Sequence, residues 1–328
     1  MTLTPLKYLK NRDMQFKPFV PFFCAFLVAC SPVIAQEKKD RKADKQRIDA
    51  KDLPTCDRKL TYKSVDGKSF QLHVFETGPS EAGPNLPAND NRAAIVFFFG
   101  GGWNNGDPKQ FYSQCRALAD LGMVAMSAEY RVASRDQSKV VDCIADAQDA
   151  ITFVRNHAAE LKIDPQRIAV GGGSAGGHLA AAVATLNYRG TQIGRSKADY
   201  RPNALILFNP ALILAPTGTV LDRDLERMGN LAERIGDKPE SASPFHHLSK
   251  DLPPTMIFHG QADTTVSYST VELFRDKAKM LGCDCRLMGY EGEGHGFFNQ
   301  GRSKYFETRD SMIAFLSELK YLPAVKRP

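Results

Sequence analysis

The chain has 328 residues, of which 43% are hydrophobic and 24% are charged, proportions that are ordinary for a globular protein with a hydrophobic core. The formal net charge is +6, and the first 35 residues contribute +3 of it. Elsewhere Lys and Arg are interspersed with Asp and Glu, so the sequence lacks the basic stripe of a nucleic-acid-binding protein, and we expect no nucleic-acid partner.

Residues 1–35 have the pattern of an export signal, in which a basic stretch precedes an apolar run and then small residues. The run from Phe19 to Cys30 is short for a transmembrane helix and is interrupted by Pro21. Cleavage after Ala35 would release a periplasmic or secreted protein. The segment Leu27-Val28-Ala29-Cys30 also resembles a bacterial lipobox, which would leave Cys30 lipid-anchored at the new N-terminus, and an uncleaved anchor is a third outcome.

Residues 36–55 are rich in charge and poor in apolar side chains, so we interpret them as a tether before a folded domain at residues 56–328. The domain opens with alternating runs at Lys59–Val65 and Ser69–Phe75. Between them stands Asp66-Gly67, which is typical of a hairpin turn. The pattern predicts two antiparallel strands.

Farther along the chain, continuous apolar runs alternate with segments of helical spacing. The runs are Ala93–Phe99, Met123–Ala128, Ile168–Val170, Ala204–Phe208, Thr255–Phe258 and Arg286–Tyr290. The helical segments are Gln110–Leu121, Val140–Leu161, Ala175–Leu186, Thr270–Leu281 and Thr308–Leu319. This alternation predicts an α/β fold with a mostly parallel central sheet, helices on both faces and the hairpin as antiparallel edge strands. Residues 211–249 do not fit it, and we predict a small helical, lid-like excursion there, over the carboxyl edge of the sheet.

The predicted domain contains five cysteines, namely Cys56, Cys115, Cys143, Cys283 and Cys285. An exported protein meets an oxidising compartment, in which disulfides can form, and the odd number leaves at least one cysteine unpaired or with a partner elsewhere. We favour Cys115 with Cys143, because both fall on helices beside the same central strand. The chain has no paired C-x-x-C and no histidine cluster at ligand spacing. We therefore expect no zinc site.

The glycine-rich segment Gly171–Gly177 contains Ser174 and stands between a predicted strand and an Ala-rich helix. This is the context of the G-x-S-x-G elbow, a sharp turn that lifts a serine hydroxyl clear of the sheet. A phosphate-binding turn is the alternative, but the G-K-[ST] ending of that motif is missing. We predict that Ser174 is a nucleophile.

A serine nucleophile needs a base, and the base needs an acid that orients it. His295 lies in a glycine-flanked loop after the last strand, and Asp263 follows the strand before it. The order Ser, Asp, His is the one expected for such an elbow. We predict Ser174, Asp263 and His295 as the catalytic set.

Acyl transfer also needs N–H donors for the oxyanion. The segment Gly100-Gly101-Gly102-Trp103 ends the first apolar run, so we predict Gly101, Gly102 and Ala175 as the donors. Three further residues are candidate substrate contacts, namely Trp103, His178 and His246. Packing within the nucleophile helix is the alternative for His178, and a solvated loop position is the alternative for His246.

These glycine, serine and histidine segments together resemble the hormone-sensitive-lipase-like branch of the α/β-hydrolases. Compact bacterial esterases related to acetyl-xylan and feruloyl esterases are more similar still. The resemblance covers about Leu60 to Leu322 and implies the α/β-hydrolase fold and ester hydrolysis without metal or cofactor. Two departures matter: Phe99 stands where the lipase-like branch has histidine, and only the tether precedes the hairpin where that branch has a cap region. Both favour an open, shallow pocket.

The resulting hypothesis is a carboxylic ester hydrolase that forms an acyl-enzyme on Ser174. Its substrates would be short-acyl esters, with acetylated or feruloylated carbohydrate as the specific expectation. A single-domain serine peptidase, a lactone hydrolase and a non-catalytic binding protein remain alternatives. The sequence does not indicate an oligomeric state.

Overall fold

The computed structural model describes residues 53–77, 91–187, 200–219, 225 and 230–322. The chain divides into compact units at Met1–Ala43 and Asp44–Pro328, and all described residues belong to the second unit. The predicted export signal and almost all of the tether lie outside the described residues and stay predictions. Within the described ranges, no helix is long and apolar enough to cross a membrane.

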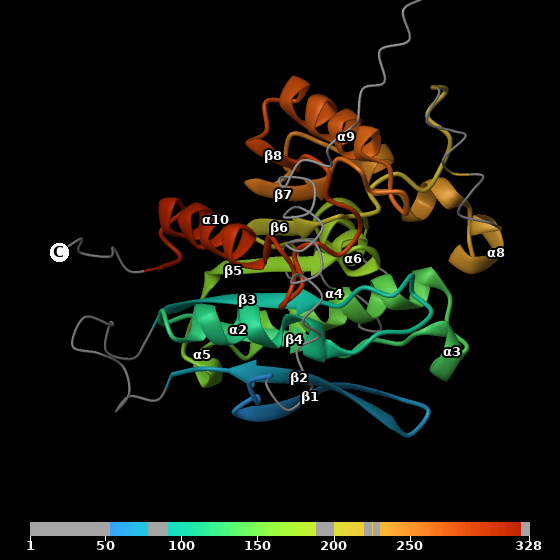
Figure 1. Cartoon of the computed structure of the whole chain (residues 1–328). Helices are drawn as coiled ribbons and strands as arrows, with labels where there is room; N and C mark the ends of the chain where they lie inside the picture. Colours follow the sequence, from blue (N-terminus) through green and yellow to red (C-terminus); the bar gives the residue numbers. More distant parts are fainter. Residues whose placement is uncertain (1–52, 78–90, 188–199, 220–224, 226–229, 323–328) are drawn as a thin grey trace, which may run out of the picture. The chain divides into compact units, whose positions relative to one another are not determined.

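An eight-stranded sheet with the strand order β1-β2-β4-β3-β5-β6-β7-β8 forms the centre of the second unit (Figure 1). Strands β1 and β2 are antiparallel to each other, β2 is antiparallel to β4, and all other neighbours are parallel. The predicted mostly parallel sheet with an antiparallel hairpin at its edge is therefore confirmed. The strands are β1 (Arg58–Val65), β2 (Lys68–Phe75), β3 (Arg92–Phe98), β4 (Val124–Ala128), β5 (Ile163–Gly173), β6 (Ala204–Phe208), β7 (Thr255–Gly260) and β8 (Cys285–Tyr290).

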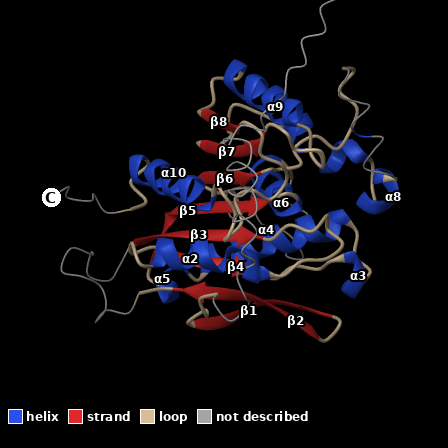
Figure 2. Ribbon diagram, viewed as in Figure 1, coloured by secondary structure: helices blue, strands red, loops and turns tan. Residues whose placement is uncertain are grey.

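Helices cover both faces of this sheet (Figure 2). Helices α4, α6 and α9 pack in the hydrophobic cluster on one face, whereas α2 and α10 pack in the cluster on the other. The longer helices are α2 (Tyr112–Ala119), α4 (Val140–Asn156), α6 (Ala175–Thr185), α9 (Tyr268–Met280) and α10 (Tyr305–Glu318). Shorter ones are α3 (Ala133–Asp136), α5 (Ala158–Leu161), α8 (Leu231–Ile235) and the 3-10 helices η2 (Pro108–Phe111), η3 (Pro239–Ala242) and η4 (Pro244–His247).

Strand β3 shows why its sequence is a continuous apolar run. Val96 and Phe98 pack against the helices of one face, and Ile95 and Phe97 pack on the other. All four side chains are fully buried. Burial on both faces removes the polar alternation that a half-exposed strand would need.

Strand β5 is longer than the predicted Ile168–Val170, because it begins at Ile163 and continues through the glycines to Gly173. Glycine is usually unfavourable in a strand. Here a Cβ at Gly171 would overlap the ring of Phe97 on the neighbouring strand. The large side chain of β3 thus fills the space that the glycine leaves.

The favoured disulfide between Cys115 and Cys143 is wrong. Both residues lie beside the central strands, but Cys115 belongs to the hydrophobic cluster on one face and Cys143 to the cluster on the other. The sheet therefore separates the two sulfur atoms. All five described cysteines are free, and the Cys143 thiol instead donates to the carbonyl oxygen of Arg131 at 3.1 Å.

Candidate active site

Ser174 lies between the end of β5 and the start of α6, in a backbone conformation that non-glycine residues rarely adopt. Its φ is 54° and its ψ is −117°. The backbone holds this turn from both sides, since Ser174 N–H donates to Phe208 O at 2.8 Å and Ser174 O accepts from His178 N–H at 2.9 Å. Strained conformations of this kind persist only where the surroundings impose them, and they gather at functional sites.

The two glycines of the G-x-S-x-G motif are needed for close packing. A Cβ at Gly172 would overlap backbone atoms of Gly176, and a Cβ at Gly176 would overlap the carbonyl of Phe98. The first turn of α6 thus lies directly against the ends of β5 and β3. This explains the spacing of the motif, because any side chain at either position would push the helix away from the sheet.

Asp263 and His295 follow β7 and β8 and are brought together by the sheet. His295 Nδ1 lies 2.7 Å from Asp263 Oδ2, and the N–H groups of Thr265 and Val266 donate to Asp263 Oδ1 at 2.8 and 3.0 Å. Burial alone would raise the pKa of Asp263, but hydrogen bonds from His259, His295 and the Val266 N–H outweigh it and hold that pKa far below its usual range. Asp263 is therefore an ionised acceptor, and it favours the His295 tautomer that carries its proton on Nδ1 and leaves Nε2 free to take one.

Two residues that the sequence analysis did not single out also hold Asp263. Asn209 follows β6 directly, has a φ of 43°, and donates from Nδ2 to Asp263 Oδ2 at 2.6 Å. His259, fully buried in β7, has Nε2 at 3.3 Å from the same oxygen. The available signal for Asn209 was its place at the carboxyl end of a strand, the edge that also carries Ser174.

The predicted oxyanion donors lie in the glycine loop, residues 100–106, and at the start of α6. Gly102 and Ala175 line the same cavity as Ser174. Gly101 and Gly102 have φ values of 123° and 62°, which favour glycine at both positions. The Ala175 N–H stands at the N-terminus of α6, where the helix dipole favours negative charge.

Gln110 in η2, a residue that the sequence pattern did not indicate, connects the glycine loop to the loop after β8 that carries His295. Its Oε1 accepts from Gly100 N–H at 2.6 Å, and its Nε2 donates to Asn299 Oδ1 at 3.0 Å. Asn299 in turn donates from Nδ2 to Gly296 O, next to His295, at 2.9 Å. One amide side chain therefore links the loops that carry the candidate donors and the candidate base.

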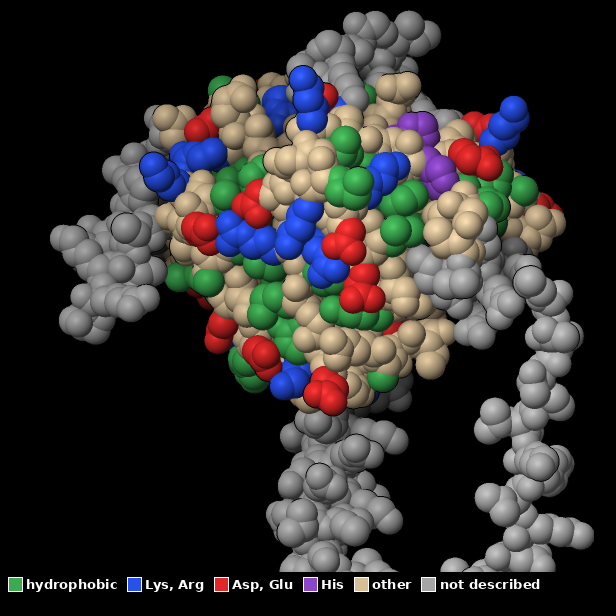
Figure 3. Space-filling view, turned by 90° about the horizontal axis from the view of Figure 1, so that it is seen from above, with side chains coloured by type: hydrophobic (Ala, Val, Ile, Leu, Met, Phe, Trp, Pro, Cys, Tyr) green, Lys and Arg blue, Asp and Glu red, His purple; other side chains and the backbone are tan. Residues whose placement is uncertain are grey.

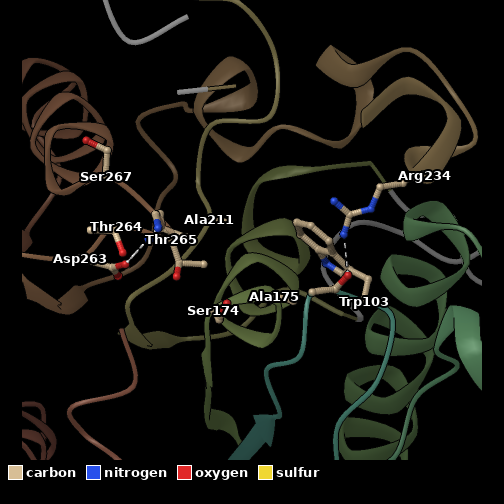
Figure 4. A pocket seen from close by; sticks show the side chains of 11 residues that line it. Trp103, Ser174, Ala175, Ala211, Arg234, Asp263, Thr264, Thr265 and Ser267 are labelled. Carbon is tan, nitrogen blue, oxygen red and sulfur yellow. Dashed lines mark hydrogen bonds between the residues drawn. The ribbon is translucent and has the colours of Figure 1, made fainter. Parts of the chain in front are cut away.

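The cavity at Ser174 has a volume of about 460 Å³. Figure 4 shows Trp103 and Arg234 on one side of Ser174 and the segment from Asp263 to Ser267 on the other. The lining residues are Gly102, Trp103, Ser174, Ala175, Ala211, Arg234, Asp263, Thr264, Thr265, Val266 and Ser267. Ala211 and Arg234 come from the excursion (residues 211–249), so the excursion forms part of the cavity wall.

Of the three predicted substrate contacts, only Trp103 lines this cavity. The prediction for His178 is wrong, because its ring is fully buried: Nδ1 accepts from Trp103 Nε1 at 3.1 Å, and Nε2 lies 2.7 Å from Ala242 O. Burial lowers the pKa of His178 to about 4. The ring nitrogens of His246 contact Ser243 Oγ and Pro216 O inside the excursion, and His246 is not among the residues that line the cavity, so its role stays a prediction.

A model of the BD-FAE family matches residues 85–278, which is more than half of the chain. The chain belongs to the BD-FAE family of α/β-hydrolase esterases. The resemblance and the fold predicted from the glycine, serine and histidine segments are thereby confirmed. Among the described residues, no group of three or more His, Cys, Asp or Glu side chains could hold a metal ion.

Solved structures similar to this BD-FAE chain include a thermophilic esterase, Est2, from Thermogutta terrifontis with propionate bound. It is 44% identical, has a TM-score of 0.74, and the match covers 84% of this chain and 98% of that one. The same esterase has also been solved with butyrate bound and phosphorylated by paraoxon. The predicted class, a carboxylic ester hydrolase, is confirmed by this similarity.

Curated relatives of the BD-FAE chain are esterases as well. A probable carboxylic ester hydrolase, LipM, from Mycobacterium tuberculosis is 30% identical over 206 residues, which are 60% of this chain and 47% of that protein. An acetylxylan esterase from Xylanibacter ruminicola is 26% identical over 274 residues, which are 81% of this chain and 53% of that protein. The chain thus spans about half the length of the curated relatives it matches.

Proposed function

We propose that this chain hydrolyses short-acyl esters through an acyl-enzyme on Ser174. His295 Nε2 takes the hydroxyl proton as Ser174 Oγ attacks the ester carbonyl, and the N–H groups of Gly101, Gly102 and Ala175 stabilise the oxyanion. The protonated His295 then gives its proton to the leaving alcohol while Asp263 stabilises the imidazolium. Water repeats the sequence on the acyl-enzyme and releases the acid.

One observation carries the proposal. Ser174 lies in a strained turn at the N-terminus of α6 and lines the same cavity as Asp263. The carboxylate oxygen Oδ2 of Asp263 lies 2.7 Å from His295 Nδ1. A turn that only connected a strand to a helix would not need a non-glycine residue at a φ of 54°. The imidazole that this buried carboxylate of the cavity holds is the base that we propose for the serine.

The expected substrates are esters of small acids. Propionate and butyrate are the acids bound to the Thermogutta terrifontis esterase, and an acetylxylan esterase is among the curated relatives. A cavity of about 460 Å³ has room for a small acyl group and part of an alcohol. Acetylated or feruloylated carbohydrate is the specific natural substrate class that we propose.

Hydrolysis of p-nitrophenyl esters from acetate to decanoate tests the proposal, with Ser174→Ala beside Ser64→Ala, which removes an exposed hydroxyl of the remote hairpin. We expect the highest kcat/KM for acetate to butyrate, no turnover above background in Ser174→Ala, and normal turnover in Ser64→Ala. A fluorophosphonate should label Ser174, as peptide mass spectrometry would show. Unchanged turnover in Ser174→Ala would overturn the mechanism, and a preference for p-nitroanilides or lactones would replace the substrate class.

We further propose that the protein is exported, on the basis of the pattern in residues 1–35. Mass spectrometry of the mature protein from expressing cells is expected to find Gln36 or a lipidated Cys30 at the N-terminus. An intact Met1 terminus on protein from the cytosolic fraction would contradict export.

A further inference from the structure

Trp103 is the sole tryptophan of the sequence and is held between the excursion and the nucleophile helix. Its Nε1 donates to His178 Nδ1 in α6 at 3.1 Å. On its other side, the guanidinium of Arg234 in α8 lies 5.5 Å from the centre of the indole ring. His178 Nε2 then contacts Ala242 O, back in the excursion, at 2.7 Å. These contacts connect the glycine loop, the nucleophile helix α6 and the excursion to one another.

Two peptide planes meet at Gly102, and Arg234 holds the second of them. The Gly101 carbonyl accepts from the N–H groups of Asn104 and Asn105 at 3.1 and 3.2 Å. Because N–H and C=O point in opposite directions in a trans peptide, the Gly102 N–H points away from that turn. The next carbonyl, Gly102 O, accepts from Arg234 Nη2 at 2.8 Å (Figure 4).

Gly102 depends on these bonds more than another residue would. It has no side chain to limit its backbone, and its φ of 62° is one of many that glycine can adopt. The loop's own amides fix the peptide before its Cα, whereas Arg234, from outside the loop, fixes the peptide after it. Without that bond, the Gly102–Trp103 peptide can rotate about ψ of Gly102, and the glycine loop, with the Gly102 N–H that it carries, can shift relative to Ser174.

We propose that Arg234 is a positioning residue through which the excursion holds the glycine loop in the shape required for oxyanion stabilisation. The proposal rests on the proposed function, because it assigns Arg234 a part in that reaction. Arg234 acts on the donor at Gly102 through the loop carbonyl and through Trp103, and not by contact with the reacting atoms. The excursion is then a component of the catalytic geometry as well as a cavity wall.

The substitution Arg234→Met tests this, because methionine can still cover the Trp103 ring but cannot donate to Gly102 O. We expect kcat for p-nitrophenyl acetate to fall about 10-fold, less than the full loss of an oxyanion donor, while KM changes less than about twofold. The rate of inactivation by a fluorophosphonate should fall in parallel. Arg309→Met is the matched control, since Arg309 lies 4.9 Å over the Phe306 ring on α10, remote from the cavity, and its kcat should equal that of the wild type.

The fluorescence of Trp103 gives a readout that does not depend on turnover. In Arg234→Met we expect a red-shifted emission maximum and an acrylamide quenching constant at least about twice that of the wild type, because the loop would expose the indole more often. If wild-type protein failed to hydrolyse any ester, the proposed function would fall, yet quenching would still test the link between Arg234 and the loop.

A double-mutant cycle with Trp103→Phe, which removes the donor to His178, tests whether the contacts act as one unit. We expect the double variant to lose less activity than the product of the two single losses. If Arg234→Met does not accumulate as folded protein, Arg234→Lys, which keeps a cation and a donor, replaces it and should give a smaller loss of kcat.

Three results would overturn the proposal. In the first, KM rises with kcat unchanged, which would make Arg234 a substrate-binding residue. In the second, kcat and Trp103 quenching both stay at wild-type values in Arg234→Met. In the third, the losses in the double-mutant cycle multiply independently.

Discussion

Asp146 and Asp263 are two buried carboxylates with different surroundings. Asp146 accepts from Lys63 Nζ at 2.6 Å and from the Arg131 guanidinium at 2.8 and 2.9 Å. Its charge is already matched by cations, and the cluster joins β1 to α4. Asp263 accepts instead from amide groups and from the ring of His295. Its negative charge is left to stabilise the imidazolium that the proposed reaction forms.

On the outer surface, carboxylates are again paired with cationic side chains, as Asp146 is. On the face above α9, basic and acidic side chains lie beside one another (Figure 3). Among the described side chains, Arg286 pairs with Asp284 and Glu318 at 2.9 and 2.7 Å. Exposed pairs such as these contribute little to stability. The charge interactions with large expected effects are therefore the buried ones.

The largest effect is expected for Asp263→Asn. Asparagine keeps the size of the side chain but presents an amide to His295 Nδ1 and favours the wrong tautomer, so kcat should fall about 10⁴-fold. Steady-state kinetics on p-nitrophenyl acetate measures the loss. Chemical denaturation should show only a small change in the free energy of unfolding. A loss of kcat below about tenfold would remove Asp263 from the mechanism.

For Asp146→Ala we expect the opposite outcome, a loss of stability with kcat unchanged. Lys63 and Arg131 would lose a buried counter-charge, so the free energy of unfolding should fall by about 3–5 kcal/mol. Urea titration followed by circular dichroism measures it. The folded fraction should keep its kcat, since the cluster lies away from the cavity lining. A variant of normal stability would show that the charges of this cluster are matched without Asp146.

His178 extends the comparison to a buried base whose ring contacts an indole N–H and a backbone carbonyl. Burial lowers its pKa from the ordinary value of 6.5 to about 4, so the unfolded chain binds a proton more readily than the folded one. The associated stability is complete above pH 6.5 and is lost as the pH falls towards about 4, with a total of about 3 kcal/mol.

Unfolding free energies of the wild type and His178→Gln, measured from pH 7.5 to 4, test this pH dependence. The glutamine variant should be less stable at neutral pH and should show a shallower decline between pH 6.5 and 4. Parallel curves for the two proteins would mean that the ring of His178 is not the neutral buried base that its contacts imply.

The smallest effect is expected for Asn209→Gly, which removes one donor from Asp263 and leaves a residue that tolerates the φ of 43° at this position. Loss of a hydrogen bond to a charged group costs about 1.5–3 kcal/mol. With the Thr265 and Val266 N–H groups, His295 and His259 still in place on Asp263, we expect a loss near the lower limit, about a tenfold decrease in kcat. Unchanged kcat would restrict Asn209 to a structural role.

Much of the fold followed from local pattern. The Asp66-Gly67 turn has positive φ at both residues, as expected for a two-residue hairpin. The apolar runs became parallel strands because both of their faces are buried. The predicted helix Val140–Leu161 is divided at His157 into α4 and α5. The sequence did not predict this break, because the helical spacing of apolar residues continues across it.

The sequence by itself determined which residues form the candidate catalytic set and at which edge of the sheet they lie. Ser174, Asp263 and His295 each follow a strand of a parallel sheet, and in such a sheet the carboxyl ends of the strands lie along one edge. Side-chain identity and strand order were enough to assign the family and to bring these residues to the same region. Gly172 and Gly176, which make close backbone contacts at the elbow, were also identifiable in the sequence as the glycines of the G-x-S-x-G motif.

Only the tertiary structure decided which face a side chain occupies and what it touches. Cys115 and Cys143 lie beside the same strands but on opposite faces, because a helix that follows a strand can cross to either side of the sheet. His178 is turned into the core, and Arg234 reaches Gly102 across 132 positions of sequence. Contacts of that range depend on how the excursion folds back over the sheet, and no local pattern encodes that path.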